Sequence, residues 1–259
     1  MGLEVLLLFS DIALNNKFNN NNGDYKVTNV LGREVYYNSS RWRLINILRD
    51  EAKKIIKALK THQIRAEVHG SISRGDVNKN SDIDVFISYS ISSHKVELAL
   101  QLAGYKFYSR KIAQATPRHT PKAHIFLNPE KKSTVTFPLT RFGRLEIEFY
   151  KFGGVLDLTE LERDIRVPGI NKQLLLIQPT PKGHIESYII GKEAAAAKIV
   201  GVSLEVVQER VRVLTRRKET GRTGIFVSKE IGPDQSFEEV LKKISETNPI
   251  VRRRLNETN

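Results

Sequence analysis

Two short apolar segments, separated by a polar loop, place the strongest constraint on how this chain folds. Residues 66–69 read as a strand that ends at Gly70-Ser71, and residues 82–88 read as a second strand with alternating apolar side chains. Ten residues separate Ser71 from Asp82, which leaves room only for a turn or a short helix. The two strands are therefore expected to lie close together.

The second strand begins with two aspartates that share one face. Side chains two apart on a strand point the same way, so Asp82 and Asp84 present two carboxylates together. Such a pair repels itself unless a cation lies between the two groups. Mg²⁺ takes one or two carboxylates together with phosphates and water, so the pair predicts a metal site.

The Gly70-Ser71 turn predicts a phosphate site next to that pair. A glycine lets a phosphate approach the backbone, and the start of the following helix offers N–H groups and the Ser71 hydroxyl. Arg74, one turn further on, adds a positive charge. Either motif alone is typical of an ordinary turn or strand end, whereas the two together are far more specific.

This arrangement resembles the DNA polymerase β nucleotidyltransferase superfamily, in which a strand, Gly-Ser, a short helix and Asp-x-Asp follow one another. The pattern Gly70-Ser71-x-x-Arg74-Gly75, with residues 81–86, is similar to archaeal CCA-adding enzymes and related predicted archaeal nucleotidyltransferases. The resemblance covers residues 42–152. It implies a polymerase β-like mixed sheet with flanking helices.

The resemblance also implies a third carboxylate on a later strand. Residues 144–152 are predicted to form that strand, with Glu146 and Glu148 on one face. Apolar residues follow the family's acid, which favours Glu148, and Glu146 is kept as the alternative metal ligand.

The implied reaction is metal-dependent transfer of a nucleoside monophosphate from an NTP, such as ATP, to an acceptor hydroxyl, of the EC 2.7.7 type. Two Mg²⁺ ions, with Mn²⁺ as the alternative, would activate the hydroxyl and stabilise the pyrophosphate leaving group. Asp82 and Asp84 would bind both ions and Glu148 the ion near the nucleophile. Gly70, Ser71 and Arg74 would hold the phosphates.

The charge of the chain predicts a polyanionic partner, RNA or DNA. The net charge is +13, and residues 104–144 hold nine Lys or Arg against the single acid Glu130. The alternatives are a generally basic or thermophilic surface, or a pair of hairpins decorated with lysine.

A second feature with the same implication lies near the C-terminus. Residues 196–207 resemble the core of a helix-turn-helix, with helices at 192–200 and 204–217 and a wing after Gly221. Arg210 stands where the motif usually has an apolar residue, which weakens this match. A helical hairpin that packs on the catalytic domain fits equally well.

We predict an α+β protein with three parts: an N-terminal hairpin extension (1–37), a nucleotidyltransferase domain (38–154) and a mainly helical domain (155–259). A helix from Arg41 to about residue 60, capped by Ser40, and a helix start near 180–186 are also expected. The chain has no cysteine, and its apolar N-terminal run is too short to span a bilayer, so we expect a cytoplasmic protein without membrane contact. The oligomeric state stays open.

Three functions follow as hypotheses. The first is addition of a nucleotide to an RNA or DNA end, and the second is nucleotidylation of a protein or small molecule. The third is a nucleic-acid-binding regulator with an inactive transferase domain. The chain is short for a CCA-adding enzyme, so that particular activity is not predicted.

Overall fold

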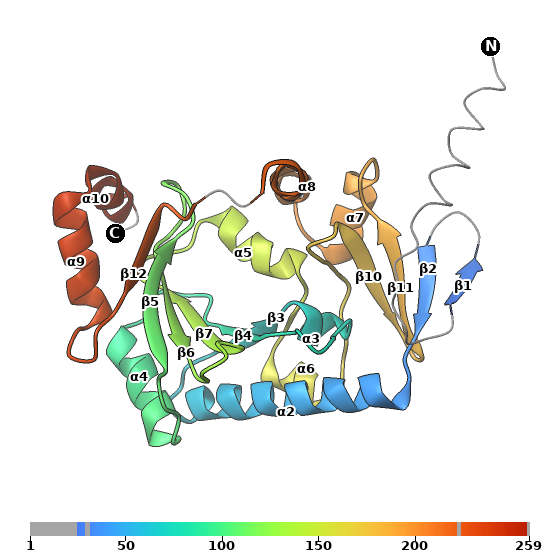
Figure 1. The fold of residues 1–259 in the computed structure, drawn as a ribbon, viewed down its shortest axis with the longest axis horizontal. Helices are drawn as coiled ribbons and strands as arrows, with labels where there is room; N and C mark the ends of the chain where they lie inside the picture. The colour runs from blue at the N-terminus through green and yellow to red at the C-terminus, as the bar shows by residue number, and fades with distance from the viewer. Residues whose placement is uncertain (1–24, 29–31, 222–223, 258–259) are drawn as a thin grey trace, which may run out of the picture.

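The computed structural model describes residues 25–28, 32–221 and 224–257, which form two β-sheets with helices around them (Figure 1). The larger sheet is mixed, helices flank it, and the region near the C-terminus is largely helical. These features confirm the predicted α+β class. The apolar run near the N-terminus lies outside the described residues.

The larger sheet carries the two motifs. Its strand order is β12-β5-β6-β7-β4-β3-β8. The strands are β3 (Glu67–His69), β4 (Ile83–Phe86), β5 (Ser109–Gln114), β6 (Lys122–Phe126), β7 (Ser133–Pro138), β8 (Val155–Leu156) and β12 (Val227–Glu230). Only β4 and β7 pair in parallel among the described strands, so β7 runs directly beside the aspartate strand.

The smaller sheet has the order β1-β2-β11-β10-β9. Its strands are β1 (Tyr25–Thr28), β2 (Gly32–Tyr36), β9 (Gly169–Ile170), β10 (Leu175–Thr180) and β11 (Gly183–Tyr188). The pairing of β1 with β2 confirms the predicted hairpin. The helix start expected at 180–186 is wrong, because β10 and β11 form a hairpin in which Thr180 faces Gly183.

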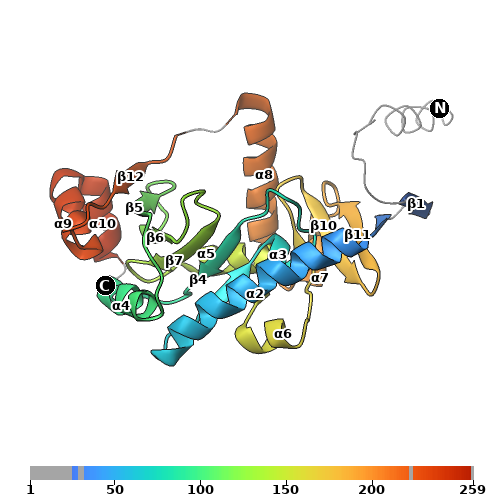
Figure 2. The same cartoon turned by 60° about the horizontal axis from the view of Figure 1, so that its bottom comes forward.

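Helix α2 (Ser39–Thr61) runs along both sheets, as Figures 1 and 2 show. Its apolar positions recur every three or four residues, and this face is buried, with Ile55 and Leu59 fully inaccessible. The cap is Asn38, whose side chain accepts the Arg41 N–H at 2.9 Å, and not the predicted Ser40. The helix therefore begins before Ser40.

The remaining described helices cover the two sheets and the C-terminal region. They are α3 (Ser71–Arg74), α4 (Ser93–Leu102), α5 (Arg144–Phe152), α6 (Leu158–Glu162), α7 (Glu193–Val200), α8 (Leu204–Thr220), α9 (Phe237–Thr247) and α10 (Pro249–Asn256). Among the described residues, no helix is both long and apolar enough to cross a bilayer.

The strand predicted over residues 144–152 is wrong, because Arg144–Phe152 forms α5. Glu146, in the first turn, accepts the Gly143 N–H at 3.2 Å and so satisfies a free donor at the helix start. Leu145, Phe149 and Phe152 pack in the same apolar cluster. Their spacing of four and three is helical, and this periodicity outweighs the short alternation in the sequence.

The chain returns to the larger sheet near its C-terminus. β12 pairs with β5, and Phe237 of α9 and Val251 of α10 are buried in the main core. The wing predicted after Gly221 therefore does not form from β12, and residues 222–223 lie outside the described residues. The division predicted at residue 154 stays a prediction.

Candidate active site

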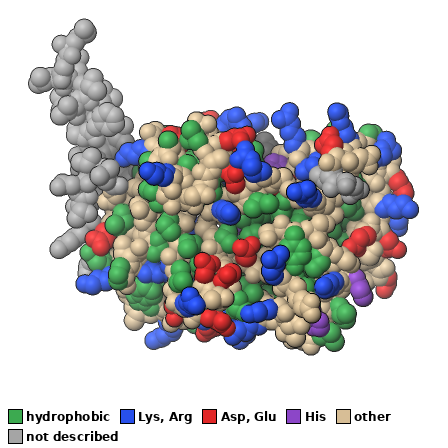
Figure 3. Space-filling view, turned by 180° about the vertical axis from the view of Figure 1, so that it is seen from behind, with side chains coloured by type: hydrophobic (Ala, Val, Ile, Leu, Met, Phe, Trp, Pro, Cys, Tyr) green, Lys and Arg blue, Asp and Glu red, His purple; other side chains and the backbone are tan. Residues whose placement is uncertain are grey.

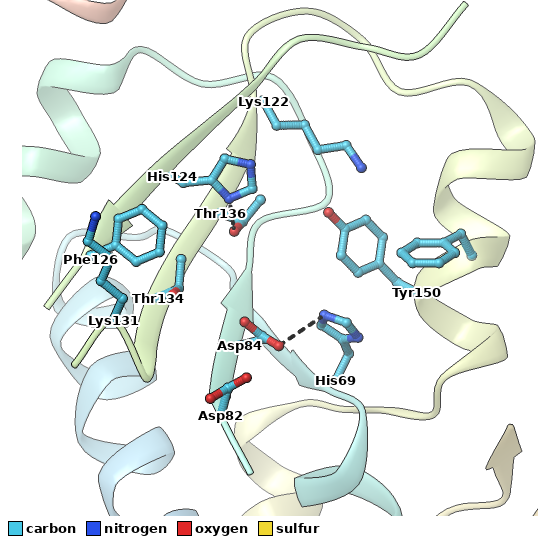
Figure 4. A pocket seen from close by; sticks show the side chains of 11 residues that line it. His69, Asp82, Asp84, Lys122, His124, Phe126, Lys131, Thr134, Thr136 and Tyr150 are labelled. Carbon is cyan, nitrogen blue, oxygen red and sulfur yellow. Dashed lines mark hydrogen bonds and ion pairs between the residues drawn. The ribbon is translucent and has the colours of Figure 1, made fainter. Parts of the chain in front are cut away.

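The two aspartates line a cleft of about 370 Å³ at the surface of the larger sheet. Asp84 lies on β4 and faces His69 of the neighbouring strand β3, and Asp82 directly precedes β4. Figure 4 shows both carboxylates at one end of the cleft. The structure thus places Asp82 and Asp84 on one face, in the arrangement that the alternation predicts.

Burial disfavours the charged form of both carboxylates. The pKa of Asp82 is raised by desolvation and then by the negative charge of Asp84, and the pKa of Asp84 is raised by desolvation. Lys172, in the loop between β9 and β10, counters both shifts with its positive charge. Two partly desolvated acids side by side form a place where a bound cation is favoured.

His69 is a neighbour of the pair that sequence reasoning missed. Its Nε2 lies 4.0 Å from Asp84 Oδ2, and its ring packs edge-on against Phe86 and Tyr150. Burial, followed by the charge of Arg74, lowers the pKa of His69 to about 3, so the imidazole is neutral at pH 7. His69 directly precedes Gly70 and is paired with Asp84 on the adjacent strand. This position at the end of β3 is the signal that could have identified it.

The Gly70-Ser71 turn stands at the entrance to α3. Gly70 has a φ of 88°, which favours glycine, and a Cβ at this position would meet open space. The Ser71 hydroxyl lies 3.2 Å from the Ser81 hydroxyl, next to the start of the aspartate strand. The space beside the Gly70 Cα is therefore open, whereas the Gly70 N–H already donates to the Gly154 carbonyl at 3.0 Å.

Arg74 does not reach the cleft. It is buried, pairs with the Asp76 carboxylate at 3.0 Å through both Nε and Nη2, and donates to the Gly153 carbonyl. These bonds tie α3 to the loop behind β3. The predicted contact of Arg74 with phosphate is therefore not supported by its position.

Glu146 does not line the cleft and is bonded elsewhere. Its carboxylate accepts the Thr120 N–H at 3.0 Å and the Thr120 hydroxyl at 2.6 Å, and Arg254 lies 3.7 Å away. Since α5 is a helix, Glu146 and Glu148 do not share the face of a strand beside Asp84. Glu146 instead joins α5 to the loop before β6.

Glu148 connects α5 to the C-terminal helices. It accepts the Ser203 N–H at 2.9 Å and the Ser203 hydroxyl, and Arg144 pairs with it at 2.7 Å. These bonds lower the pKa of Glu148, with the Ser203 hydroxyl as the largest cause. Neither glutamate lines the cleft, so the structure does not bring the predicted third carboxylate to the pair.

The other walls of the cleft come from β6, β7 and α5. The lining side chains beyond His69 and the aspartates are Lys122, His124, Phe126, Lys131, Thr134, Thr136, Phe149 and Tyr150. We call Asp82 and Asp84 the acidic wall, and Lys122, His124, Phe126 and Lys131 the basic wall. Figure 4 shows Lys122 and His124 across the cleft from the aspartates.

Lys122 is held over aromatic rings in the basic wall. Its Nζ lies 5.1 Å from the ring centroids of both Phe142 and Tyr150, and burial lowers its pKa. Beside it, His124 Nδ1 lies 3.0 Å from the Thr136 hydroxyl, and burial lowers the pKa of His124 to about 4. His124 is therefore neutral at pH 7, and the charge of this wall comes from its lysines.

The basic stretch predicted to flank the cleft contributes two of its nine cations, Lys122 and Lys131, to the lining. Others have structural partners: Arg110 pairs with Glu97 at 2.6 Å, and Arg144 pairs with Glu148. On the face opposite to Figure 1, Lys and Arg side chains are interspersed with acids and do not form one continuous patch (Figure 3). The nine cations of this stretch therefore do not all serve the cleft.

The predicted helical pair forms as α7 and α8, joined at Gly201, which adopts a left-handed conformation. The start of α8 packs on α5: Ser203 bonds Glu148, Glu205 pairs with Arg144, and Arg210 lies 4.9 Å from the ring of Phe149. In a helix-turn-helix, the N-terminal end of the second helix contacts the DNA bases. Here that end of α8 is covered by α5. This packing favours the alternative reading of a docked hairpin.

In the part of the chain that the structure describes, only the aspartate pair brings carboxylates to the cleft as ligands for a metal. Among the residues that the structure describes, no group of three or more His, Asp or Glu side chains is arranged to hold a metal ion. Two carboxylates suffice for an Mg²⁺ ion that also binds phosphates and water.

Two aspartates in one cleft with lysines opposite, and a Gly-Ser turn directly after the cleft residue His69, define a site for nucleotide chemistry. A family profile for a nucleotidyltransferase domain matches residues 49–178, half of the 259-residue chain, and this range contains every residue that lines the cleft. The chain therefore belongs to this nucleotidyltransferase family, which makes it a transferase of nucleoside monophosphates. A search of curated proteins finds no match to the chain.

Proposed function

We propose that this protein is a metal-dependent nucleotidyltransferase that moves a nucleoside monophosphate from an NTP to the hydroxyl of a nucleic acid end. The observation that carries this proposal is the cleft itself, in which Asp82 and Asp84 lie across from Lys122 and Lys131. In the reaction the acceptor oxygen bonds to the α-phosphorus and the bond to pyrophosphate breaks.

The aspartate pair fits one divalent ion, Mg²⁺ or Mn²⁺. Desolvation raises the pKa of both acids, and the charge of Asp84 raises the pKa of Asp82 further. A bound cation would offset these costs. When bound, the ion supplies charge neutralisation for the transferring phosphoryl group.

The protein's own residues supply binding and orientation. Lys122 and Lys131 would bind triphosphate oxygens, and the Ser71 hydroxyl, beside the open space at Gly70, would hold a further phosphate. Lys172 adds positive charge beside the aspartates. The His69 ring lies beside the Asp84 carboxylate and is neutral, so it would not repel a bound cation.

The exposed part of α8 supports a nucleic acid as the acceptor. Arg212, Arg216, Arg217 and Lys218 are exposed beyond the docked first turns, and the same helix contacts the cleft residue Phe149 through Arg210. A strand bound along this side by its phosphates would lead toward the cleft. The similarity to archaeal CCA-adding enzymes stays a prediction.

One observation favours a second candidate, a nucleic-acid-binding regulator with an inactive transferase domain: Glu146 and Glu148 bond elsewhere and leave the cleft with two acids. Nucleotidylation of a protein or small molecule is the remaining alternative. The chemistry of the site is the same for that acceptor, so the alternatives are separated by experiment.

The test incubates the protein with each α-labelled NTP, Mg²⁺ or Mn²⁺, and separate pools of RNA, DNA, proteins and small molecules. We expect label in a nucleic acid pool, and its loss with Asp84→Asn. The matched control is Asp50→Asn, which removes an exposed surface acid paired with Lys53. Label confined to proteins or small molecules would show that the acceptor is not a nucleic acid. No label in any pool would favour the nucleic-acid-binding regulator.

A further inference from the structure

The strand beside Asp84 brings no acid to the cleft. β7 pairs in parallel with β4, with Asp84 opposite Thr134 and Phe86 opposite Thr136. Side chains of paired residues in a sheet point to the same face, so the two threonines lie on the side of the aspartates, and both line the cleft. A third carboxylate on this strand would have to replace one of them.

The next strand also brings no acid. On β6, His124 faces Thr136 and Phe126 faces Thr134, and Lys122 lies two residues before His124. The Thr136 hydroxyl is already within 3.0 Å of His124 Nδ1. A hydroxyl, a neutral imidazole and an ammonium group are weak or unfavourable neighbours for Mg²⁺, which prefers carboxylate and phosphate oxygens.

The two acids of α5 are committed to other partners. Glu146 accepts two hydrogen bonds from Thr120, and Glu148 accepts two from Ser203 and one from Arg144. Moving either carboxylate into the cleft would leave these donors without partners. Within the described ranges, therefore, Asp82 and Asp84 are the only carboxylates that line the cleft.

We propose that the site binds one divalent ion together with its nucleotide, in place of the two ions implied by the resemblance to the polymerase β superfamily. Thr134 and Thr136 occupy the wall from which a second ion would need a carboxylate, and the amino group of Lys122 lines the same cleft. This inference rests on the proposed function, since the ion arrives with the NTP. It corrects the two-ion expectation and leaves the transfer reaction in place.

The test counts ions in the full-length protein. Mn²⁺ is titrated in the presence of an equimolar, non-hydrolysable NTP analogue and followed by electron paramagnetic resonance. We expect one Mn²⁺ per protein–nucleotide complex and no spin coupling between ions. Two Mn²⁺ per complex, with the coupling of ions about 4 Å apart, would overturn the inference.

Two pairs of variants test the role of β7. Thr134→Asp and Thr136→Asp each add a carboxylate, whereas Thr134→Asn and Thr136→Asn add a neutral group of the same shape. We expect a second Mn²⁺ with at least one Asp variant and with neither Asn variant. If both Asp variants fold and stay at one ion, the assignment to β7 is wrong; if they fail to fold, the wild-type count decides.

The proposed function fails in a different way. A wild-type protein that binds neither the analogue nor Mn²⁺ would refute nucleotide transfer, and the ion count with it. A wild-type protein that binds the analogue with two ions would refute the ion count alone.

Discussion

The acidic wall and the basic wall of the cleft have opposite charge, yet both are unfavourable to the folded protein without a ligand. In the acidic wall, desolvation raises the pKa of Asp82 and Asp84. In the basic wall, desolvation lowers the pKa of Lys122. A complex of a divalent ion with a triphosphate carries the two charges that would satisfy both walls. Ligand binding, and not the stability of the free protein, therefore explains these charges.

The largest expected effect removes the charge of the acidic wall. Asp84→Asn should lower kcat/KM for NMP transfer by roughly 1,000-fold, since losing the ion removes several kcal/mol of charge stabilisation in the transition state. The measurement is transfer of α-label at saturating Mg²⁺. Asp50→Asn should retain wild-type activity. Wild-type activity of Asp84→Asn would show that the acidic wall has no role in transfer.

A smaller effect is expected in the basic wall. Lys122→Met should raise KM for the NTP about tenfold, because a hydrogen bond from a charged donor contributes about 1.5–3 kcal/mol. The folded pKa of Lys122 is lowered, so its charge costs stability at pH 7, and the Met variant should be at least as stable as wild type. Initial rates and thermal unfolding test both points.

The control for Lys122→Met is Lys106→Met, which changes an exposed lysine outside the cleft. An equal rise in KM for both variants would show that general charge, and not the basic wall, attracts the nucleotide.

A smaller effect is expected at Glu148, which lies outside both walls. Glu148→Gln should keep activity but lower the free energy of unfolding by about 1 kcal/mol at pH 7, because its bonds to Ser203 weaken. The folded pKa of Glu148 lies below its ordinary value of 4.5, so this stability is present above pH 4.5 and is lost as the pH falls through the folded pKa. Denaturant unfolding at pH 7 and pH 4 measures the difference.

Glu219→Gln, at an exposed position of α8, is the matched control for Glu148→Gln and should change neither property. A loss of activity with Glu148→Gln as large as that with Asp84→Asn, in a protein that remains folded, would restore Glu148 as the third carboxylate.

The smallest expected effect is on thermal stability without metal. Asp82→Asn should raise Tm by about 1 °C at pH 7, because it removes a carboxylate whose charged form is disfavoured in the folded protein. The folded pKa lies above the ordinary value of 3.8, so the cost is present at neutral pH and disappears as the pH falls through the raised pKa. Calorimetry at pH 7 and pH 4 should show the gap closing, and a lower Tm for the variant at pH 7 would contradict this reading.

The acidic wall was predictable because its signals are local. Alternation over residues 82–88 places both aspartates on one face, and the glycine before Ser71 marks the end of β3. Only a few residues on two adjacent strands are needed, so a short window of sequence contains the arrangement.

The basic wall was not predictable in the same way, because it depends on contacts between distant elements. Lys122 and His124 face the aspartates only because β7 lies between β6 and β4. The sequence of α5 fits two periods: Leu145, Ile147 and Phe149 alternate, while Leu145, Phe149 and Phe152 follow helical spacing. Packing against α8 and β9 selects the helix and carries Glu148 away from the cleft.

Nucleotidyl transfer at the acidic wall is tested most directly by measuring which phosphate of the NTP is transferred. Purified protein is incubated with Mg²⁺, a nucleic acid pool and NTP labelled at either the α- or the γ-phosphate. We predict that α-label enters the pool, that γ-label leaves as pyrophosphate, and that Asp84→Asn does neither. Transfer of γ-label, or equal transfer of α-label by Asp84→Asn, would contradict nucleotidyl transfer at the acidic wall.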